Sequence, residues 1–221
     1  MGLDTFSLGC IATTTVGVGT MVWSSRAGVR WTEFIAKPLA SAAFVALALG
    51  QGAREHPVGQ TMFWALVLCA LGDVLLIPKD RRAFTAGLFA FLLGHVGFAV
   101  AFVQRGIDPT SAALGGLAVA AVAVPILRWL MPHVRASEPA MVVPVLAYVA
   151  VIATMVALAV GTTFSTASPD LAWLGAALAF FVSDLSVARD RFVATEWTNR
   201  LWGLPLYFGS TVAFALLSAP P

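Results

Sequence analysis

The amino-acid sequence predicts an all-α protein, a polytopic membrane bundle of about eight transmembrane helices, and three features predict this class. Hydrophobic residues make up 59% of the 221 residues, and charged residues make up 11%. The mean hydropathy is +0.88. A soluble domain carries about 25% charged residues, so this chain has too few charges to cover a surface in contact with water. We therefore expect lipid to be its main solvent and residues 1–221 to form a single transmembrane domain.

Eight apolar segments follow one another along the chain, separated by charged, Pro-rich or Gly-rich breaks. Each crossing needs roughly 20 mostly apolar residues, because a backbone in hydrocarbon must satisfy its own hydrogen bonds. The first segment is rich in Thr and Gly, and no Lys or Arg precedes it, so we expect a retained span and not a signal peptide. The expected spans are approximately 3–22, 34–50, 58–77, 83–104, 110–130, 139–160, 170–188 and 201–218.

The basic residues are distributed unevenly between the two sides of this eight-span topology. Arg54 and Arg105 fall on one side, and all other Lys and Arg residues fall on the opposite side. Positive residues concentrate in cytoplasmic loops, so the basic side is predicted to be cytoplasmic and both termini to be outside. The protein is thus expected to be a multi-pass protein of the cell (inner) membrane. A miscounted helix would have scrambled this bias, which therefore also supports the count of eight.

The net charge and the cysteines argue against several functions. The formal net charge of +2 is spread over loops, which argues against nucleic acid as a partner and leaves the headgroups of membrane lipids as the natural counterions. Cys10 and Cys69 lie inside apolar stretches and lack the spacing of a metal motif. We interpret both as packing residues.

Ionisable residues inside a membrane span are costly and usually functional. Asp73 and Asp184 lie at similar distances from the predicted cytoplasmic ends of the third and seventh spans. A polar cluster at one depth suits a site for a lipid, because the tail can stay in the bilayer while the headgroup meets water. The other candidate members of this cluster are Lys37, His95, Tyr148 and Ser183.

Each candidate also has a purely structural interpretation. An Asp near a helix end can reach water or pair with an arginine of the next loop. Lys37 can extend its stem to the interface. His95 and Tyr148 can be hydrogen-bonded packing residues. Two aspartates at matched depth favour a functional role over these interpretations.

The two aspartates also suggest an internal repeat. Asp73 and Asp184 are 111 residues apart, and each ends the third span of a four-span half. A basic-Asp-Arg segment follows each of them, at 79–81 and 189–191. A tandem four-helix repeat would preserve the orientation of the halves and place both carboxylates beside a central axis. The similarity is short, and coincidence is the alternative, since basic loops commonly follow spans.

Several segments resemble the YhhN family of membrane proteins, which includes the lysoplasmalogenases. They occur in order across most of the chain, as Lys37-Pro38-Leu39, Gly72-Asp73-Val74-Leu75-Leu76, Gly87-Leu88-Phe89 through Gly94-His95, Tyr148, Gly175 through Ser183-Asp184, and Arg191-Phe192. The resemblance implies an eight-span fold and hydrolysis of the vinyl ether bond of lysoplasmalogen, which yields a fatty aldehyde and glycerophosphoethanolamine or glycerophosphocholine. Asp73 and Asp184 resemble the paired aspartates of the family. Phe98 is a departure, because many relatives carry Tyr three residues after the His.

Vinyl ether cleavage begins with protonation of the β-carbon, and water then captures the resulting oxocarbenium ion. This chemistry needs an acid and a nearby anion, and two carboxylates in a partly desolvated site can divide these tasks. We predict Asp73 and Asp184 to be catalytic, without deciding which is the acid. Lys37 would bind phosphate or act on a neighbouring carboxylate, and His95 would orient water or hold an Asp. The route requires no cofactor and no metal, although two Asp and one His could hold a cation.

Two functions from other classes are alternatives to the hydrolase. A small proton-coupled transporter would relay protons through Asp73, Asp184 and His95, and a non-catalytic lipid-binding membrane protein would use the same pocket. A transporter needs polar groups that reach both faces, whereas the external half carries little besides three glutamines. We therefore rank the hydrolase first, with a lysophospholipid as its substrate and membrane lipids around it. The sequence does not indicate an oligomeric state.

Overall fold

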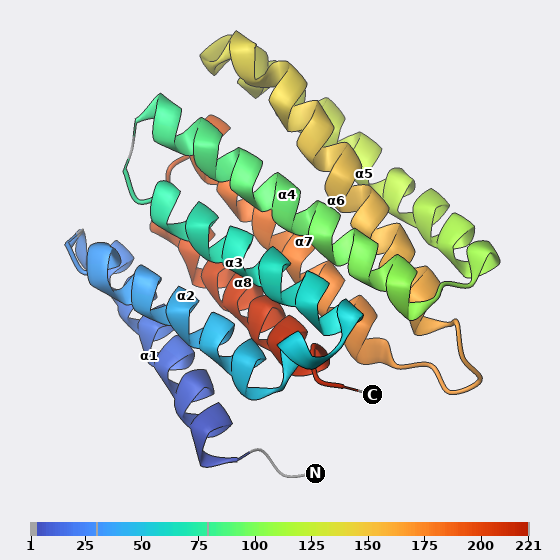
Figure 1. Cartoon of the computed structure of the whole chain (residues 1–221). Coiled ribbons are helices and arrows are strands. Elements are labelled where there is room, and N and C mark those ends of the chain that lie inside the picture. Colours follow the sequence, from blue (N-terminus) through green and yellow to red (C-terminus); the bar gives the residue numbers. More distant parts are fainter. Residues whose placement is uncertain (1–3, 30, 79, 221) are drawn as a thin grey trace.

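The computed structural model describes residues 4–29, 31–78 and 80–220, and it shows a bundle of long helices (Figure 1). Within the described residues, eight helices are long and apolar enough to cross a membrane, which confirms the predicted fold class. The helices are α1 Thr5–Ala27, α2 Glu33–Gly50, α3 Pro57–Leu75, α4 Arg81–Arg105, α5 Pro109–Ser137, α6 Val142–Thr163, α7 Leu171–Phe192 and α8 Trp197–Leu217, with short 3₁₀ turns η1 Ala53–Glu55 and η2 Pro139–Met141.

Aspartates begin four of the helices. The side chains of Asp4, Asp80, Asp108 and Asp170 each accept a hydrogen bond from a backbone N–H in the first turn of the following helix. The first N–H groups of a helix lack partners within it, and an Asp cap satisfies one or two of them. Several of the few acidic residues of this chain therefore mark helix boundaries.

Several helices extend beyond their expected spans, and α5 and α7 do so at the end that carries the candidate site. α5 continues to Ser137 although its span was expected to end near 130, and it contains Pro132. Proline is tolerated in membrane helices, because neighbouring groups can satisfy the carbonyl that it frees. α7 continues to Phe192, four residues past the expected 188. Asp184 is therefore farther from the end of its helix than Asp73 is. The expectation that the two aspartates lie at similar distances from the ends of their spans was wrong.

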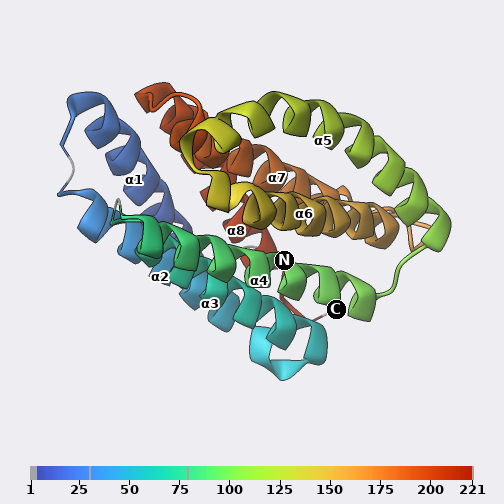
Figure 2. The same ribbon diagram turned by 90° about the horizontal axis from the view of Figure 1, so that it is seen from above.

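Six helices form a closed ring, in which α2, α3, α4, α6, α7 and α8 each contact the next and α8 contacts α2. α1 packs outside the ring against α2 and α8, while α5 packs outside against α6 and α7. The view from above shows α1 and α5 at opposite margins (Figure 2). The contacts α1–α2, α2–α3, α3–α4 and α8–α2 recur in the second half as α5–α6, α6–α7, α7–α8 and α4–α6. This arrangement agrees with a tandem four-helix repeat.

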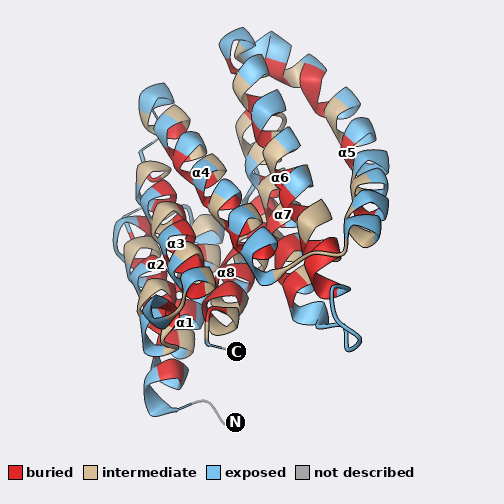
Figure 3. Ribbon diagram, turned by 45° about the vertical axis from the view of Figure 1, so that its right-hand side comes forward, coloured by how far each residue is buried: buried red, intermediate tan, exposed pale blue. Residues whose placement is uncertain are grey.

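The buried faces of the helices point into the ring and the exposed faces point outward (Figure 3). Aromatic side chains fill much of the interior, and the largest fully buried ones include Phe44, Phe98, Phe180 and Phe214. α3 and α4 approach closely at Gly94, where an added Cβ would lie 2.9 Å from Cys69 Sγ. Small residues permit such close helix contacts in membranes.

α1 begins and α8 ends at the same end of the bundle (Figure 1), as an even number of crossings requires. We call the opposite end the basic end. It carries the α1–α2, α3–α4, α5–α6 and α7–α8 connections, and it is the end predicted to face the cytoplasm.

Candidate active site

A cavity of about 380 Å³ opens near the basic end of the bundle. Its apolar walls come mainly from α4, α5, α6 and α7, and include Leu88, Leu130 and Val149. Its polar side chains come from α2, α3, α6, α7 and α8, and they include the predicted residues Lys37, Asp73, Tyr148, Ser183 and Asp184. A single-chain lipid offers the matching combination of one apolar and one polar end.

Asp73 on α3 is held by three side chains from two other helices. The ammonium of Lys37 lies 3.2 Å from Oδ1. The hydroxyls of Ser41 and Tyr207 each donate a hydrogen bond of 2.6 Å to Oδ2. The side chain of Asp73 is only 1% exposed. A buried carboxylate is tolerated when it is paired and hydrogen-bonded in this way.

Asp184 on α7 has different partners. Tyr148 on α6 donates a hydrogen bond of 2.8 Å to Oδ2, and Nε2 of His95 on α4 lies 3.4 Å from the same oxygen. The Asp184 side chain is 17% exposed. Of the two aspartates, it is therefore the one more open to a molecule in the cavity.

The His95 ring is oriented by its own helix. Its Nδ1 lies 2.7 Å from the carbonyl oxygen of Phe91. A carbonyl only accepts, so Nδ1 carries a hydrogen and donates it. In a neutral imidazole, the lone pair of Nε2 then faces Asp184. A hydrogen bond between His95 and Asp184 would therefore need a proton on the carboxyl or on the imidazole.

Aromatic rings connect the two aspartate sites. The ring of Phe180 lies 4.5 Å from that of His95 and 5.3 Å from that of Tyr207, measured between centroids. Asp73 and Asp184 thus share one cavity and a common aromatic wall while keeping separate hydrogen-bond partners. From the sequence we expected the two carboxylates to meet in one site, and both line the same cavity.

The second helix of each half supplies a partner to the aspartate of its own half. Lys37 on α2 forms an ion pair with Asp73, and Tyr148 on α6 donates a hydrogen bond to Asp184. Lys37 and Tyr148 are 111 residues apart, the same offset as the aspartates. The site residues therefore follow the offset that the possible repeat predicts.

The fourth helix of each half supplies a partner to the aspartate of the other half. His95 on α4 approaches Asp184, and Tyr207 on α8 donates a hydrogen bond to Asp73. These two residues are 112 apart. Each half of the chain thus completes the site of the other.

Tyr207 and Ser41 were not identified from the sequence. The repeat offset contains the missing signal for Tyr207, because His95 shifted by 111 falls one residue before it. Tyr148 and Tyr207 are also the only two tyrosines of the chain, and both bond an aspartate. Ser41 gave no comparable signal in a helix rich in small residues.

Ser183 precedes Asp184 in the chain, but its hydroxyl is engaged within its own helix. It is 2% exposed, and its hydroxyl donates to the carbonyl of Phe180 in its own helix. It lines the cavity, but its donor is engaged in the helix. Its predicted role in substrate binding remains a prediction.

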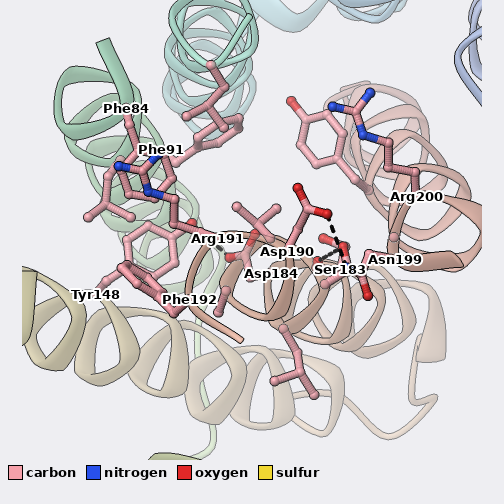
Figure 4. A pocket seen from close by; sticks show the side chains of 18 of the residues that line it. Phe84, Phe91, Tyr148, Ser183, Asp184, Asp190, Arg191, Phe192, Asn199 and Arg200 are labelled. Carbon is pink, nitrogen blue, oxygen red and sulfur yellow. Dashed lines mark hydrogen bonds between the residues drawn. The ribbon is translucent and has the colours of Figure 1, made fainter. Parts of the chain in front are cut away.

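Charged side chains surround the cavity at the basic end. Arg191 and Arg200 flank it on opposite sides, with Asp190 between them (Figure 4). Arg191 Nη2 lies 2.5 Å from Glu138, and its guanidinium lies over the ring of Phe84. Within the described part of the chain, the buried Nε of Arg191 has no hydrogen-bond partner. An oxyanion in the cavity would provide an acceptor for it.

On the far flank, Arg200 pairs with Glu33 and bonds Ser25. Asn199 donates to Asp190 across the α7–α8 connection. These bonds tie α1, α2, α7 and α8 together around the mouth of the cavity.

The family model that matches this chain is described as the YhhN family, and it covers residues 32–217. The chain belongs to the YhhN family. Every residue discussed above as a partner of Asp73 or Asp184 lies inside the matched region. The YhhN family resemblance noted in the sequence is thereby confirmed.

Relatives of this YhhN chain carry a common name. A Mycobacterium bovis protein named lysoplasmalogenase is 30% identical over 184 residues, which cover 80% of this chain and 67% of that protein. Proteins of Bos taurus and Homo sapiens named lysoplasmalogenase TMEM86A are 29% identical over 203 and 204 residues, which cover 89% of this chain and 82% of each relative. No solved structure gives a significant match.

The sequence also left open that two Asp and one His of this YhhN chain hold a cation. Among the residues that the structure describes, no group of three or more His, Cys, Asp or Glu side chains is arranged to hold a metal ion. The ammonium of Lys37 lies against Asp73, where such a cation would have to bind.

Proposed function

We propose that this YhhN protein is a membrane hydrolase that cleaves the vinyl ether bond of lysoplasmalogens, yielding a fatty aldehyde and glycerophosphoethanolamine or glycerophosphocholine. The observation that carries the proposal is a pair of aspartates with unequal partners that line one cavity between apolar walls and a basic mouth. The names of the relatives from Mycobacterium bovis, Bos taurus and Homo sapiens support the same activity.

Asp184 is the acid in this proposal, with His95 as its proton partner. It is the more exposed carboxyl, and the proton that lies between it and His95 is the one available to the substrate. In the first step, Asp184 gives its proton to the β-carbon of the vinyl ether. The π electrons form the new C–H bond, and an oxocarbenium ion remains. General acid catalysis of this kind contributes typically 10²–10⁴-fold to a rate.

Asp73 supplies the fixed negative charge beside the developing cation. Ser41 and Tyr207 donate to this carboxylate and the ammonium of Lys37 lies beside it, so all three favour its charged form and hold it in one position. A preorganised charge costs no reorganisation when the cation forms. Lys37 is therefore a positioning residue for Asp73 in this proposal, and the phosphate is bound elsewhere.

Water completes the reaction with balanced protons. Water adds to the oxocarbenium carbon and gives a proton back to the Asp184–His95 pair. The hemiacetal then collapses, its hydroxyl proton passing to the glycerol oxygen as the C–O bond breaks. The sum is one water consumed, one aldehyde released and one alcohol released, and the acid is regenerated.

Arg191 is the proposed ligand of the headgroup phosphate. Its Nε is buried without a hydrogen-bond partner in the described residues, and its side chain lines the cavity. Glu138 and Phe84 hold the guanidinium in place, leaving Nε to donate to a phosphate oxygen. Arginine is well suited to phosphate because its donors are fixed in a plane.

The location of the polar side chains favours a hydrolase over a proton-coupled transporter. A transporter needs polar groups that connect both faces of the membrane. The described residues that line the cavity come from helices and connections at the basic end, and none comes from the loops at the opposite end. A site open to one leaflet suits a lipid substrate, and the basic loops predict that this leaflet is the cytoplasmic one.

The decisive experiment is turnover by the purified protein of a panel of vinyl ether, alkyl ether and ester lysophospholipids, followed by mass spectrometry. We expect only the vinyl ether to be cleaved. In D₂O, with the aldehyde reduced at once to the alcohol, the product should carry one deuterium on the carbon next to the former carbonyl. Cleavage of the ester alone, or absence of this deuterium, would overturn the proposal.

Asp184→Asn tests the acid directly. It should lower kcat by about 10²–10⁴-fold while the protein stays folded in detergent. Asp108→Asn is the matched control, since it makes the same chemical change at a helix cap far from the cavity, where Asn caps as well as Asp. Full turnover by Asp184→Asn would remove Asp184 from the mechanism.

A further inference from the structure

A second hollow lies beside the active-site cavity, on the outer surface of the bundle between α4 and α6. It is a groove of about 250 Å³, formed by Leu88, Phe89, Leu92, Val143, Pro144 and Ala147. All six side chains are apolar. Phe89 is 52% exposed and Val143 is 74% exposed, so on membrane-spanning helices this groove faces the hydrocarbon of the bilayer.

Leu88 belongs to both hollows. It is half-buried on α4 and lines the active-site cavity as well as the outer groove. On α6, Val145 and Val149 line the cavity while Pro144 and Ala147 line the groove. One layer of side chains at the α4–α6 contact therefore separates the cavity from the lipid.

The same two helices hold the proposed acid. His95 on α4 and Tyr148 on α6 are the partners of Asp184. A path that enters between α4 and α6 consequently leads to the carboxyl that would protonate the substrate. The basic mouth with Arg191 lies at the end of the bundle, whereas the groove opens sideways into the membrane, as the two ends of a lysolipid require.

We propose that the hydrocarbon tail of the substrate passes between α4 and α6 and lies in the outer groove, with Leu88 determining which tails the site accepts. The inference rests on the proposed hydrolase function and adds the route of the tail. A tail that moves from the bilayer into the groove passes from one apolar environment to another, so it exposes no apolar surface to water. The groove is lined by apolar side chains, so the tail buries no polar group there.

The test compares substrates that have long and short tails in variants that fill the groove. Ala147→Trp is informative because Ala147 lines the groove and not the cavity. It should lower kcat/KM for a lysoplasmalogen with a long tail by about tenfold or more, the range that steric changes in apolar pockets produce. A water-soluble vinyl ether with a short tail should be cleaved as fast as by the wild type.

Ala150→Trp is the matched control. Ala150 is an exposed alanine on the same helix and lines neither hollow, so both substrates should be cleaved normally. Leu88→Trp should also slow cleavage of the long-tailed substrate, because Leu88 borders the groove as well as the cavity. Loss with Leu88→Trp alone would show that the tail stays inside the cavity and would overturn the proposed route, as would a parallel loss for both tails in Ala147→Trp or no loss in any variant.

A binding measurement separates this inference from the hydrolase proposal. Retention of an alkyl ether lysophospholipid, which has no vinyl ether bond to cleave, can be quantified by mass spectrometry on the purified wild type and on Ala147→Trp. Weaker retention of the long-tailed analogue by Ala147→Trp would support the route even if no vinyl ether were cleaved. Equal retention in a folded variant would overturn the route and leave the hydrolase proposal standing.

Discussion

The hydroxyl of Tyr207 lies 2.6 Å from a carboxylate oxygen of Asp73, although 134 residues separate them in the chain. The bond joins α8 to α3 and fixes the position of the most deeply buried acid of the site. The Tyr207 ring also packs edge-on against Phe44, Phe91 and Phe180. One side chain thus holds the carboxylate and forms part of the wall between the two aspartates.

Tyr207→Phe should destabilise the protein while leaving its packing intact. The substitution keeps the ring and removes one donor to a charged group, a bond worth about 1.5–3 kcal/mol. Thermal unfolding in detergent should therefore begin at a lower temperature. Ser41→Ala removes the other hydroxyl donor to the same oxygen and should have an effect of similar size. A Tyr207→Phe protein as stable as the wild type would contradict the bond.

Lys37→Met should be more damaging than the loss of either hydroxyl. It leaves the Asp73 charge without its ammonium partner, and breaking a buried ion pair from one side costs about 3–5 kcal/mol. The double variant Lys37→Met with Asp73→Asn removes both charges and should regain part of the lost stability. Unfolding curves of Lys37→Met, Asp73→Asn and the double variant decide the matter, because losses that simply add in the double variant would mean that Lys37 and Asp73 do not interact.

Much of the fold could be predicted from the sequence because membrane spans have a strong signal. Backbone in hydrocarbon must be helical and of nearly fixed length, and charged residues interrupt the apolar runs. The largest error was the end of α5, which was expected near residue 130 while the helix continues to Ser137. Charged residues and prolines, which predict breaks between spans, also occur inside long membrane helices, so the sequence alone does not mark the end.

The charged residues of the site could be predicted from the sequence, but the pairs that they form could not. Asp73, Asp184 and Lys37 were identified because charged groups are rare inside spans. Their pairing depends on which helices are neighbours, and the spacing of residues along the chain does not contain that information. Tyr207 was missed because a tyrosine in an apolar helix is usually a packing or interfacial residue.

Arg191→Gln should weaken binding of the headgroup more than it slows the chemistry. If Nε donates to the phosphate, its loss should raise KM for a lysoplasmalogen by about tenfold, the equivalent of one charge-assisted hydrogen bond, with kcat little changed. A 1-alkenylglycerol, which has no phosphate, should show no such increase. Steady-state kinetics on the two substrates measure the difference.

Arg81→Gln is the control for Arg191. Arg81 lies 3.9 Å from the same Glu138, is 63% exposed and does not line the cavity. Its substitution tests the loss of a cation beside Glu138 without changing the proposed phosphate ligand, so KM should stay near the wild-type value. An equal rise of KM in both variants would mean that Arg191 acts only by supporting the α5–α6 connection.

His95→Gln should slow proton transfer while leaving substrate binding almost unchanged. Nδ1 of His95 donates to Phe91 and Nε2 faces Asp184, so the imidazole holds one end of the proton that the proposed acid delivers. Glutamine fills part of the space but cannot exchange a proton. We expect kcat to fall by about 10²-fold or more with KM little changed, and the dependence of kcat on pH to change, because Asp184 would titrate without its partner.

Tyr148→Phe separates proton exchange from simple support of Asp184. Tyr148 donates to the same oxygen that His95 approaches, and its ring lies 5.3 Å from the His95 ring. Its hydroxyl only holds the carboxyl, so Tyr148→Phe should lower kcat less than His95→Gln and should leave the shape of the pH profile nearer to the wild type. If both variants lost the same activity with the same pH profile, His95 would be a support for Asp184 like Tyr148, and the acid would be Asp184 alone.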